Sequence, residues 1–416
     1  MKLTRPTGQE PVDLRTTDLV SAAVHGEGDP HTIWRAMRER EPVHWQQFDE
    51  KLGFWSTTTH DNVTRVLRDH TVFTSEHGTL LNLLGRKDPA SGRQLPATDP
   101  PKHTAMRSPV QRALNGRILE RHRVMIRGEI KSLLSGIVDG EPFDFAELAG
   151  KLPMAVAGML MGLDRADWPW LTFLTSQAAA PEDPEYVLPE GGRATLQQSH
   201  RELFATFSDA MSRRKGDGDG DGDLIDLLRT MELEDGSKLG AGEITSNCYS
   251  LLLGANVTTP QVPNAVILEL VESGRYAEWA DHPELLDRGL NEALRWASPV
   301  SHFMRYAKHD VELGGVSIRA GDAVVAWIGS ANRDAAVFPD PYRFDPGRDA
   351  RRQLAFGIGP HFCVGHAVAR ITLNEFLTEL FGQFENFELA GEPVHLHSNF
   401  IAGIKHLPLT ATRRRS

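Results

Sequence analysis

The sequence predicts a mainly α-helical chain with a smaller β lobe, which is an α+β protein. Residues 241–273 form a strongly apolar stretch with helical spacing, and good helix formers dominate much of residues 116–214. Shorter segments at residues 43–58 and 311–328 show alternation or glycine-containing turns, as strands do. No obvious linker divides these segments into independent cores.

The N-terminal part is predicted to build a peripheral lobe. Residues 31–41 have the pattern of an amphipathic helix, residues 43–58 that of a small hairpin, and residues 60–69 that of another helix. Periodicity is then lost over residues 74–101, where glycine and proline gather around the apolar run Leu80–Leu84. A loop of this length is usually functional or disordered.

The middle of the chain is predicted to be helical at residues 116–138, 153–161, 168–180 and 196–214. A loop rich in proline and acids, residues 181–192, lies between the last two. The acidic run 215–223 begins like a calcium-binding loop, but Leu228 stands where the bidentate glutamate belongs. We therefore expect a flexible acidic connector before a helix at residues 223–231.

Composition excludes several classes of function. The 416 residues carry a net charge of −11 and only two cysteines, Cys248 and Cys363. A disulfide framework is therefore not expected, and a reducing cytoplasm fits best. No run of about 18 apolar residues is present to span a bilayer. The lone basic run, Arg413–Arg415, ends the chain, so nothing indicates a nucleic-acid surface.

Cys363 lies in a tight loop, Phe356–Ala367, that contains three glycines and a proline and precedes a predicted helix. The helix N-terminus offers backbone N–H groups and a positive dipole end that stabilise a thiolate, the form of cysteine that binds metals. Gly359 and Gly365 would let the backbone approach a flat cofactor closely, and Phe356 would shield the sulfur from water. A lone cysteine in another context would be only a small buried hydrophobe.

The spacing Phe-Gly-x-Gly-x-His-x-Cys-x-Gly, from Phe356 to Gly365, resembles the haem-binding loop of the cytochromes P-450. The resemblance implies that Cys363 is the thiolate ligand of the iron of haem b, with Phe356, Gly357 and Gly365 beside the cofactor. It also implies the cytochrome P-450 fold, in which haem lies between a long central helix and a Cys-bearing loop and helix. Residues 30–416 would form one domain, with residues 1–29 as an N-terminal extension.

Four basic residues are expected to bind the haem propionates. His103 and Arg107 share one face of a predicted helix, where an isolated pair would ordinarily be a solvated charge pair. Their segment Asp-Pro-Pro-Lys-His-Thr-Ala-Met-Arg is similar to the propionate-binding segment of the family. Arg305 resembles a second propionate ligand, and His361 lies in the cysteine loop.

The predicted central helix carries the expected oxygen site. Gly254 and Ala255 resemble the small groove residues of the family, and Thr258 resembles its oxygen-binding threonine, but Val257 stands where an acid is usual. Pro260 lacks an N–H group, so the helix is expected to open before it. We expect a freed carbonyl, the Asn256 amide and the Thr258 hydroxyl to hold a water that replaces the acid in proton delivery.

Glu292 and Arg295 lie one helical turn apart and would by default be a surface pair. They resemble the Glu-x-x-Arg motif of the family, in which the pair is buried and joined by an arginine from a later loop. Arg343 is the candidate for that arginine and Arg348 the runner-up, and the triad is interpreted as structural. The expected substrate pocket consists of Leu83, Leu84, Val257, Val300, Phe303, Phe400 and Ile401.

The resemblance implies a haem-thiolate monooxygenase that inserts one oxygen atom from O2 into a C–H or C=C group of a small organic substrate. We expect a natural-product intermediate as substrate, ferredoxin and ferredoxin reductase as partners, electrons ultimately from NAD(P)H, and a monomeric state. Two alternatives stay open. A peroxygenase would need an acid–base aid near the iron, commonly an arginine, and residues 242–272 contain none. Val257 also motivates a haem protein that recruits or binds a partner without monooxygenation.

Overall fold

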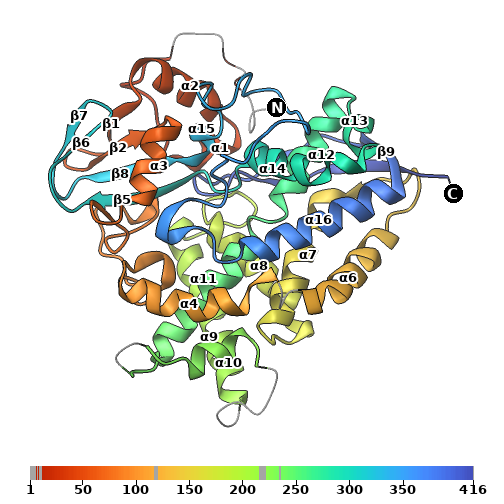
Figure 1. Cartoon of the computed structure of the whole chain (residues 1–416), viewed down its shortest axis with the longest axis horizontal. Coiled ribbons are helices and arrows are strands. Elements are labelled where there is room, and N and C mark those ends of the chain that lie inside the picture. The colour runs from red at the N-terminus through yellow and green to blue at the C-terminus, as the bar shows by residue number, and fades with distance from the viewer. Residues whose placement is uncertain are drawn as a thin grey trace.

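The computed structural model describes residues 6, 8, 12–116, 120–214, 222–233 and 236–415. A large helical part and a smaller strand-rich lobe make up the molecule, with the lobe at the left of Figure 1. Among the described residues, no helix has the length and hydrophobicity to cross a membrane. Most of the expected acidic connector, residues 215–221, lies outside the described residues.

The strand-rich lobe joins segments from distant parts of the chain. Its five-stranded sheet has the order β1-β2-β8-β5-β3, and β2 pairs with β8 in parallel although the two strands are more than 260 residues apart. The predicted hairpin is confirmed, because β1 and β2 pair antiparallel with Trp45 opposite Trp55. The elements of this lobe are α1 (Ala22–Gly26), α2 (Pro30–Arg40), β1 (Val43–Gln47), β2 (Gly53–Thr57), α3 (His60–Arg68), β3 (Phe73–Thr74), β5 (His302–Ala307), β6 (Val311–Leu313), β7 (Val316–Ile318), β8 (Ala323–Trp327) and α15 (Ile328–Ala331).

The helical part contains most of the α-helices of the described residues. They are α4 (Lys102–Ala113), α6 (Arg123–Ser135), α7 (Phe145–Leu160), α8 (Trp168–Ala179), α9 (Gly192–Arg213), α10 (Leu224–Thr230), α11 (Ala241–Asn256), α12 (Gln261–Ser273), α14 (Leu286–Ala297) and α16 (His366–Gln383), with the short α13 (Ala277–Ala280). Two small sheets flank them, built from β4 (Phe143–Asp144), β9 (Phe384–Leu389) and β12 (Pro408–Arg413), and from β10 (Val394–His395) and β11 (Ile404–His406).

One predicted helix is longer than the sequence indicated. The segment expected to start at Pro153 begins at Phe145, because the side chain of Asp144 accepts hydrogen bonds from the backbone N–H groups of Ala146 and Glu147. This is the ordinary N-cap geometry of a helix. Pro153 therefore lies inside α7 and does not start it.

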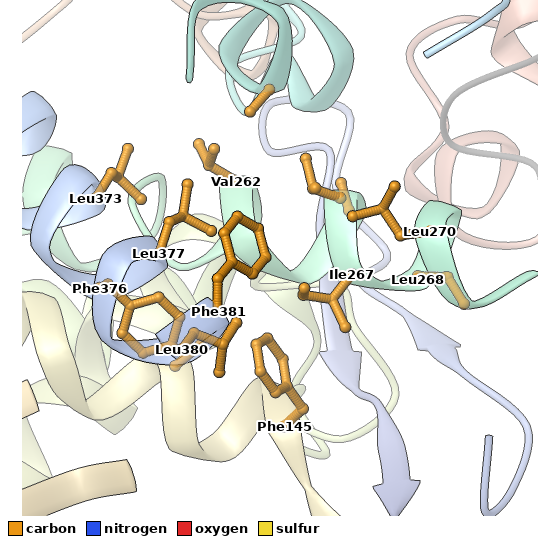
Figure 2. Close-up of a cluster of buried hydrophobic side chains, with 14 of the residues drawn as sticks. Phe145, Val262, Ile267, Leu268, Leu270, Leu373, Phe376, Leu377, Leu380 and Phe381 are labelled. Carbon is orange, nitrogen blue, oxygen red and sulfur yellow. The ribbon is translucent and has the colours of Figure 1, made fainter. Parts of the chain in front are cut away.

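The largest hydrophobic core lies between α7, α12 and α16 (Figure 2). Phe145 of α7, Ile267 of α12 and Phe376 of α16 are fully or almost fully buried there. Burying a side chain of this size stabilises the fold by about 1.5–3 kcal/mol. Since α16 follows the cysteine loop and α12 continues from α11, this core fixes the loop relative to the central helix.

The central helix is interrupted where the sequence predicts. Helix α11 ends at Asn256 and α12 begins at Gln261, with Pro260 as its N-cap. The N–H of Gln261 bonds to the Thr258 carbonyl at 3.2 Å, an i,i+3 bond that replaces the regular i,i+4 bond. Because Pro260 has no N–H, the Asn256 carbonyl loses its helical partner.

Candidate active site

A cavity of about 360 Å³ lies between α11 and the cysteine loop. Its walls come from α4, α7, α11, α14, α16, β5 and the loops around residues 79–96, 299–300 and 355–365. The volume is within the range of cofactor and ligand sites. Of the residues expected to surround a haem, the cavity brings together Cys363, His103, Arg107, Arg305, His361, Phe356, Gly357, Gly365, Gly254, Ala255 and Thr258.

Cys363 is held by the backbone of its own loop. Its N–H donates to the Phe356 carbonyl at 2.8 Å, and its carbonyl accepts from the N–H and Nδ1 of His366, the first residue of α16. Burial raises the pKa of the Cys363 thiol, opposed by the N–H of Gly365 and by the charge of Arg107. The loop alone therefore favours the thiol, whereas the sequence suggested a stabilised thiolate. A metal that binds the sulfur removes this proton.

Four basic side chains converge on one side of the cavity. The rings of His103 and His361 lie 4.3 Å apart, and an Nη of Arg107 donates to the Phe362 carbonyl of the cysteine loop. Burial, together with the charge of Arg107, lowers the pKa of His103 to about 4. Burial, together with the charge of Arg305, lowers the pKa of His361 to about 2, and burial lowers that of Arg305 to about 10.

These side chains fit a bound dianion such as the two propionates of haem. His103 Nδ1 is buried and has no hydrogen-bond partner among the described residues. Within that same part of the chain, no salt bridge joins Arg107 or Arg305 to a carboxylate. The guanidinium groups of Arg107, which is half-buried, and Arg305, which is buried, cost free energy unless anions neutralise them. The thiol of Cys363 across the same cavity completes a set of groups suited to an iron porphyrin.

The α11 side of the cavity differs from the expectation at Asn256. Val257 and Thr258 line the cavity, and the Thr258 hydroxyl donates to the Gly254 carbonyl at 2.7 Å. Asn256 does not line it. Its Nδ2 lies 3.3 Å from both Met154 Sδ and Thr175 Oγ1, on α7 and α8. The prediction that the Asn256 amide holds a water beside oxygen is therefore wrong, because successive helical side chains are rotated by about 100°.

The buried triad contains Arg348, not Arg343. Glu292 and Arg295 are fully buried and form a two-bond pair at 2.6 and 2.7 Å. Arg348 Nε donates to Glu292 Oε1 at 3.1 Å, whereas Arg343 is exposed and contributes only its carbonyl. The choice of Arg343 is therefore wrong and the runner-up is correct. The turn Asp345–Gly347 directs Arg348 inward, with the Asp345 N–H also bound to Glu292.

Of the seven residues expected in the substrate pocket, four line the cavity and three do not. Val257, Val300, Phe303 and Phe400 line the cavity. Leu83 and Leu84 instead pack in the core with Trp34, and Ile401 packs behind Val257. Residues that sequence reasoning missed are Thr79, Leu80, Leu95, Tyr249, Leu251, Leu253 and Thr259. Leu80 begins the apolar run Leu80–Leu84 of the sequence, but only the turn at Leu81–Leu83 shows which leucine faces the cavity.

Comparisons with known proteins agree with this geometry. The family profile described as cytochrome P450 matches residues 188–404. Cytochrome P450 NovI of Streptomyces niveus is 32% identical over 413 residues, covering 98% of this chain and 99% of its own. Linalool 8-monooxygenase of Pseudomonas putida is 32% identical over 412 residues, covering 95% and 97%. Mycobacterium marinum cytochrome P450 CYP268A2, solved with pseudoionone, has a TM-score of 0.86 at 29% identity, covering 97% and 100%.

The cavity, its cysteine and its basic side chains fit the class of haem-binding oxidoreductases. Together with relatives that are similar over nearly their whole length, they identify the family: the chain belongs to the cytochromes P450 and is a monooxygenase.

Proposed function

We propose that this protein inserts one oxygen atom from O2 into a C–H or C=C group of an uncharged, largely apolar natural-product intermediate. The observation that carries the proposal is the division of the cavity. Its cations gather beside the cysteine loop, while its walls away from that loop are mainly apolar, with Leu80, Leu95, Leu253, Val300 and Phe303 among them. An apolar wall selects a substrate by removing its apolar surface from water.

The residues on the side of the cavity next to the cysteine loop would hold the haem. Cys363 would bind the iron, and His103, Arg107, Arg305 and His361 would donate charge-assisted hydrogen bonds to the propionates. When bound, the haem supplies activation of dioxygen. Gly254 and Ala255 leave room above it, because a side chain at Gly254 would extend into open space in the cavity.

Thr258 is the proposed group for holding a proton near the oxidation site. Its hydroxyl donates to the Gly254 carbonyl and keeps two lone pairs that accept from a water or a substrate hydroxyl. Val257 offers no proton, and the Asn256 amide is turned toward α7 and α8. Between α11 and α12, residues 257–260 also offer backbone carbonyls and the Thr259 hydroxyl as polar groups. We propose that water bound to these groups, or the substrate, completes proton delivery.

Named relatives support the proposed substrate class. One relative is a linalool monooxygenase, and solved neighbours were crystallised with pseudoionone and with testosterone. All three are neutral molecules with few polar groups. The structural neighbour OxyD, at 26% identity and a TM-score of 0.81, is involved in the biosynthesis of vancomycin-type antibiotics. This supports a natural-product intermediate as substrate.

We propose a ferredoxin as the electron donor, docked on the face beside Cys363. Helix α4 lies along the cysteine loop through the contact of Arg107 with Phe362, and Arg112 is exposed farther along that helix. Arg352 is exposed in the segment that leads into the loop. On a chain with net charge −11, these cations would attract an acidic ferredoxin and make reduction sensitive to salt. Reduction rates of the R112E variant that equal those of the wild type at low salt would contradict this docking face.

The proposed activity is tested with the purified holoprotein, a ferredoxin, its reductase and NADPH. We expect neutral terpenoids to shift the haem spectrum on binding and to be converted to products that carry one oxygen atom from labelled O2. Products formed only with hydrogen peroxide would favour the peroxygenase instead. Binding without product under either condition would favour the recruiting role.

A further inference from the structure

A polar pair, His200 of α9 and Tyr249 of α11, lies at the wall of the cavity that α11 forms. His200 Nε2 lies 2.9 Å from the hydroxyl oxygen of Tyr249 in α11. The His200 ring stacks on Phe204 with an interplanar angle of 3°, and the Tyr249 ring meets both rings edge-on at 86° and 88°. This packing holds the Tyr249 side chain in one orientation.

Tyr249 lines the cavity far from the expected oxidation site. Tyr249, Leu253 and the C-cap residue Val257 recur every four residues, so they lie on one face of α11 and its last turn, and all three line the cavity. Eight residues at a rise of 1.5 Å separate Tyr249 from Val257 by about 12 Å along the helix. Val257 directly precedes Thr258. The backbone of Tyr249 is therefore displaced from that of Thr258 by roughly the length of a short isoprenoid chain.

The end of the cavity at Tyr249 carries polar groups among apolar side chains such as Leu95 and Leu251, whereas the wall formed by Leu253 and Val257 is apolar. Ser250 lines the cavity beside Tyr249, and Gln94, which donates to the Ser246 carbonyl, belongs to the same end. Leu253 and Val257 follow along α11. A ligand that spans the cavity from this end would thus place one polar group at Tyr249 and its apolar body beside these side chains.

The His200–Tyr249 pair is neutral and adaptable. Burial lowers the pKa of His200 and raises that of Tyr249, so neither carries a charge near neutral pH. One hydrogen bond joins them, which leaves the tyrosine hydroxyl free for another. If His200 Nε2 accepts, the Tyr249 oxygen accepts from a ligand; if Nε2–H donates, the Tyr249 hydroxyl donates to a ligand. A hydroxyl or a carbonyl suits this pair, whereas an ionised group would lose its hydration without a counter-charge.

We propose that Tyr249, positioned by His200, is a specificity-determining residue that binds the neutral polar head of an elongated apolar substrate. The opposite end of the chain then lies beside Thr258 and is the end that is oxidised. This inference rests on the proposed function, because it requires an apolar substrate in the same cavity.

The test compares two probes with nearly the same isoprenoid chain: farnesol, which carries a terminal hydroxyl, and farnesene, which carries none. Their dissociation constants are measured on the holoprotein by calorimetry and by the change in the haem spectrum. Tyr249→Phe removes the hydroxyl and keeps the ring. Tyr276→Phe is the matched control, because Tyr276 is buried in the core beside Phe381 and does not line the cavity.

We expect Tyr249→Phe to weaken farnesol binding about fivefold, the loss of one hydrogen bond, and to leave farnesene binding unchanged. The control variant should change neither. His200→Leu should weaken farnesol binding in the same direction, and His200→Gln, which keeps a hydrogen-bonding group, should restore part of it. In the wild type the farnesol product should carry the new oxygen at the end remote from the hydroxyl, and in Tyr249→Phe the products should be mixed.

Equal weakening of both probes by Tyr249→Phe, or unchanged farnesol binding, would overturn the role of Tyr249 and leave the proposed function intact. Oxidation of farnesol next to its hydroxyl in the wild type would overturn it as well. If the wild type binds neither probe, the proposed substrate class is wrong and the role of Tyr249 falls with it.

Discussion

Replacing Arg348 by alanine should lower the free energy of unfolding by about 3 kcal/mol. Its guanidinium donates to the buried Glu292 carboxylate and to the carbonyls of Pro339, Asp340 and Arg343. A hydrogen bond to a charged group contributes about 1.5–3 kcal/mol, and the bonds to carbonyls add less because water replaces them in the variant. Glu292 keeps its pair with Arg295, so the larger cost of an unpaired buried charge does not apply.

Arg343→Ala is the matched control. Arg343 belongs to the same loop, but its side chain is exposed and only its backbone carbonyl takes part in the network. Alanine retains that carbonyl, so we expect a change within about 0.5 kcal/mol, which is usual for surface substitutions.

Urea denaturation is the suitable assay, followed by the haem spectrum and by tryptophan fluorescence. For 416 residues the entropy of unfolding is about 0.9 kcal/mol/K, so 3 kcal/mol moves the melting temperature by only about 3 °C. The urea midpoint separates the variants better, since it is compared at one temperature. A normal midpoint for Arg348→Ala with a lowered one for Arg343→Ala would refute the assignment of the triad.

Three further outcomes are expected. Thr258→Ala should divert reducing equivalents to peroxide, whereas Asn256→Leu should leave the product formed per NADPH unchanged, because its amide faces away from the cavity. Arg107→Ala should weaken haem retention, measured by transfer of haem to apomyoglobin, because it removes a cation from the propionate side. A hydrogen bond to Asp144 raises the pKa of His406 above its usual value of about 6.5, so the stabilisation by this pair is full below that pH and is lost as pH rises through the folded-state pKa.

Each of these outcomes has its own control. Uncoupling in Asn256→Leu would restore the water-relay hypothesis and contradict the orientation of its amide. For haem retention, Arg112→Ala is matched to Arg107→Ala, because Arg112 lies on α4 but is exposed and does not line the cavity. For His406, the urea midpoint of the wild type minus that of His406→Gln should shrink above about pH 6.5. A difference that stays constant from pH 6 to 9 would show that the charged pair does not stabilise the fold.

Local sequence determined the features that depend on neighbouring residues. The cysteine loop and its following helix are contiguous, so their glycines, proline and apolar spacing are visible in the sequence. The break between α11 and α12 follows from Pro260, which cannot donate a backbone hydrogen bond wherever it is placed. His103 and Arg107 lie one turn apart on α4, so their shared face follows from helical geometry alone.

Tertiary structure decided the features that depend on rotation or on distant partners. Arg343 and Arg348 are both arginines of one loop, and only the turn at Asp345 aims one of them at Glu292. Asn256 adjoins two residues that line the cavity, yet its side chain is rotated by about 100° around the helix from theirs and contacts Met154 and Thr175 instead. His200 and Tyr249 are 49 positions apart and meet because α9 packs on α11. A sequence records which groups a helix carries, but the packing of helices decides which groups face one another, because many side chains fit either face until the neighbouring element is in place.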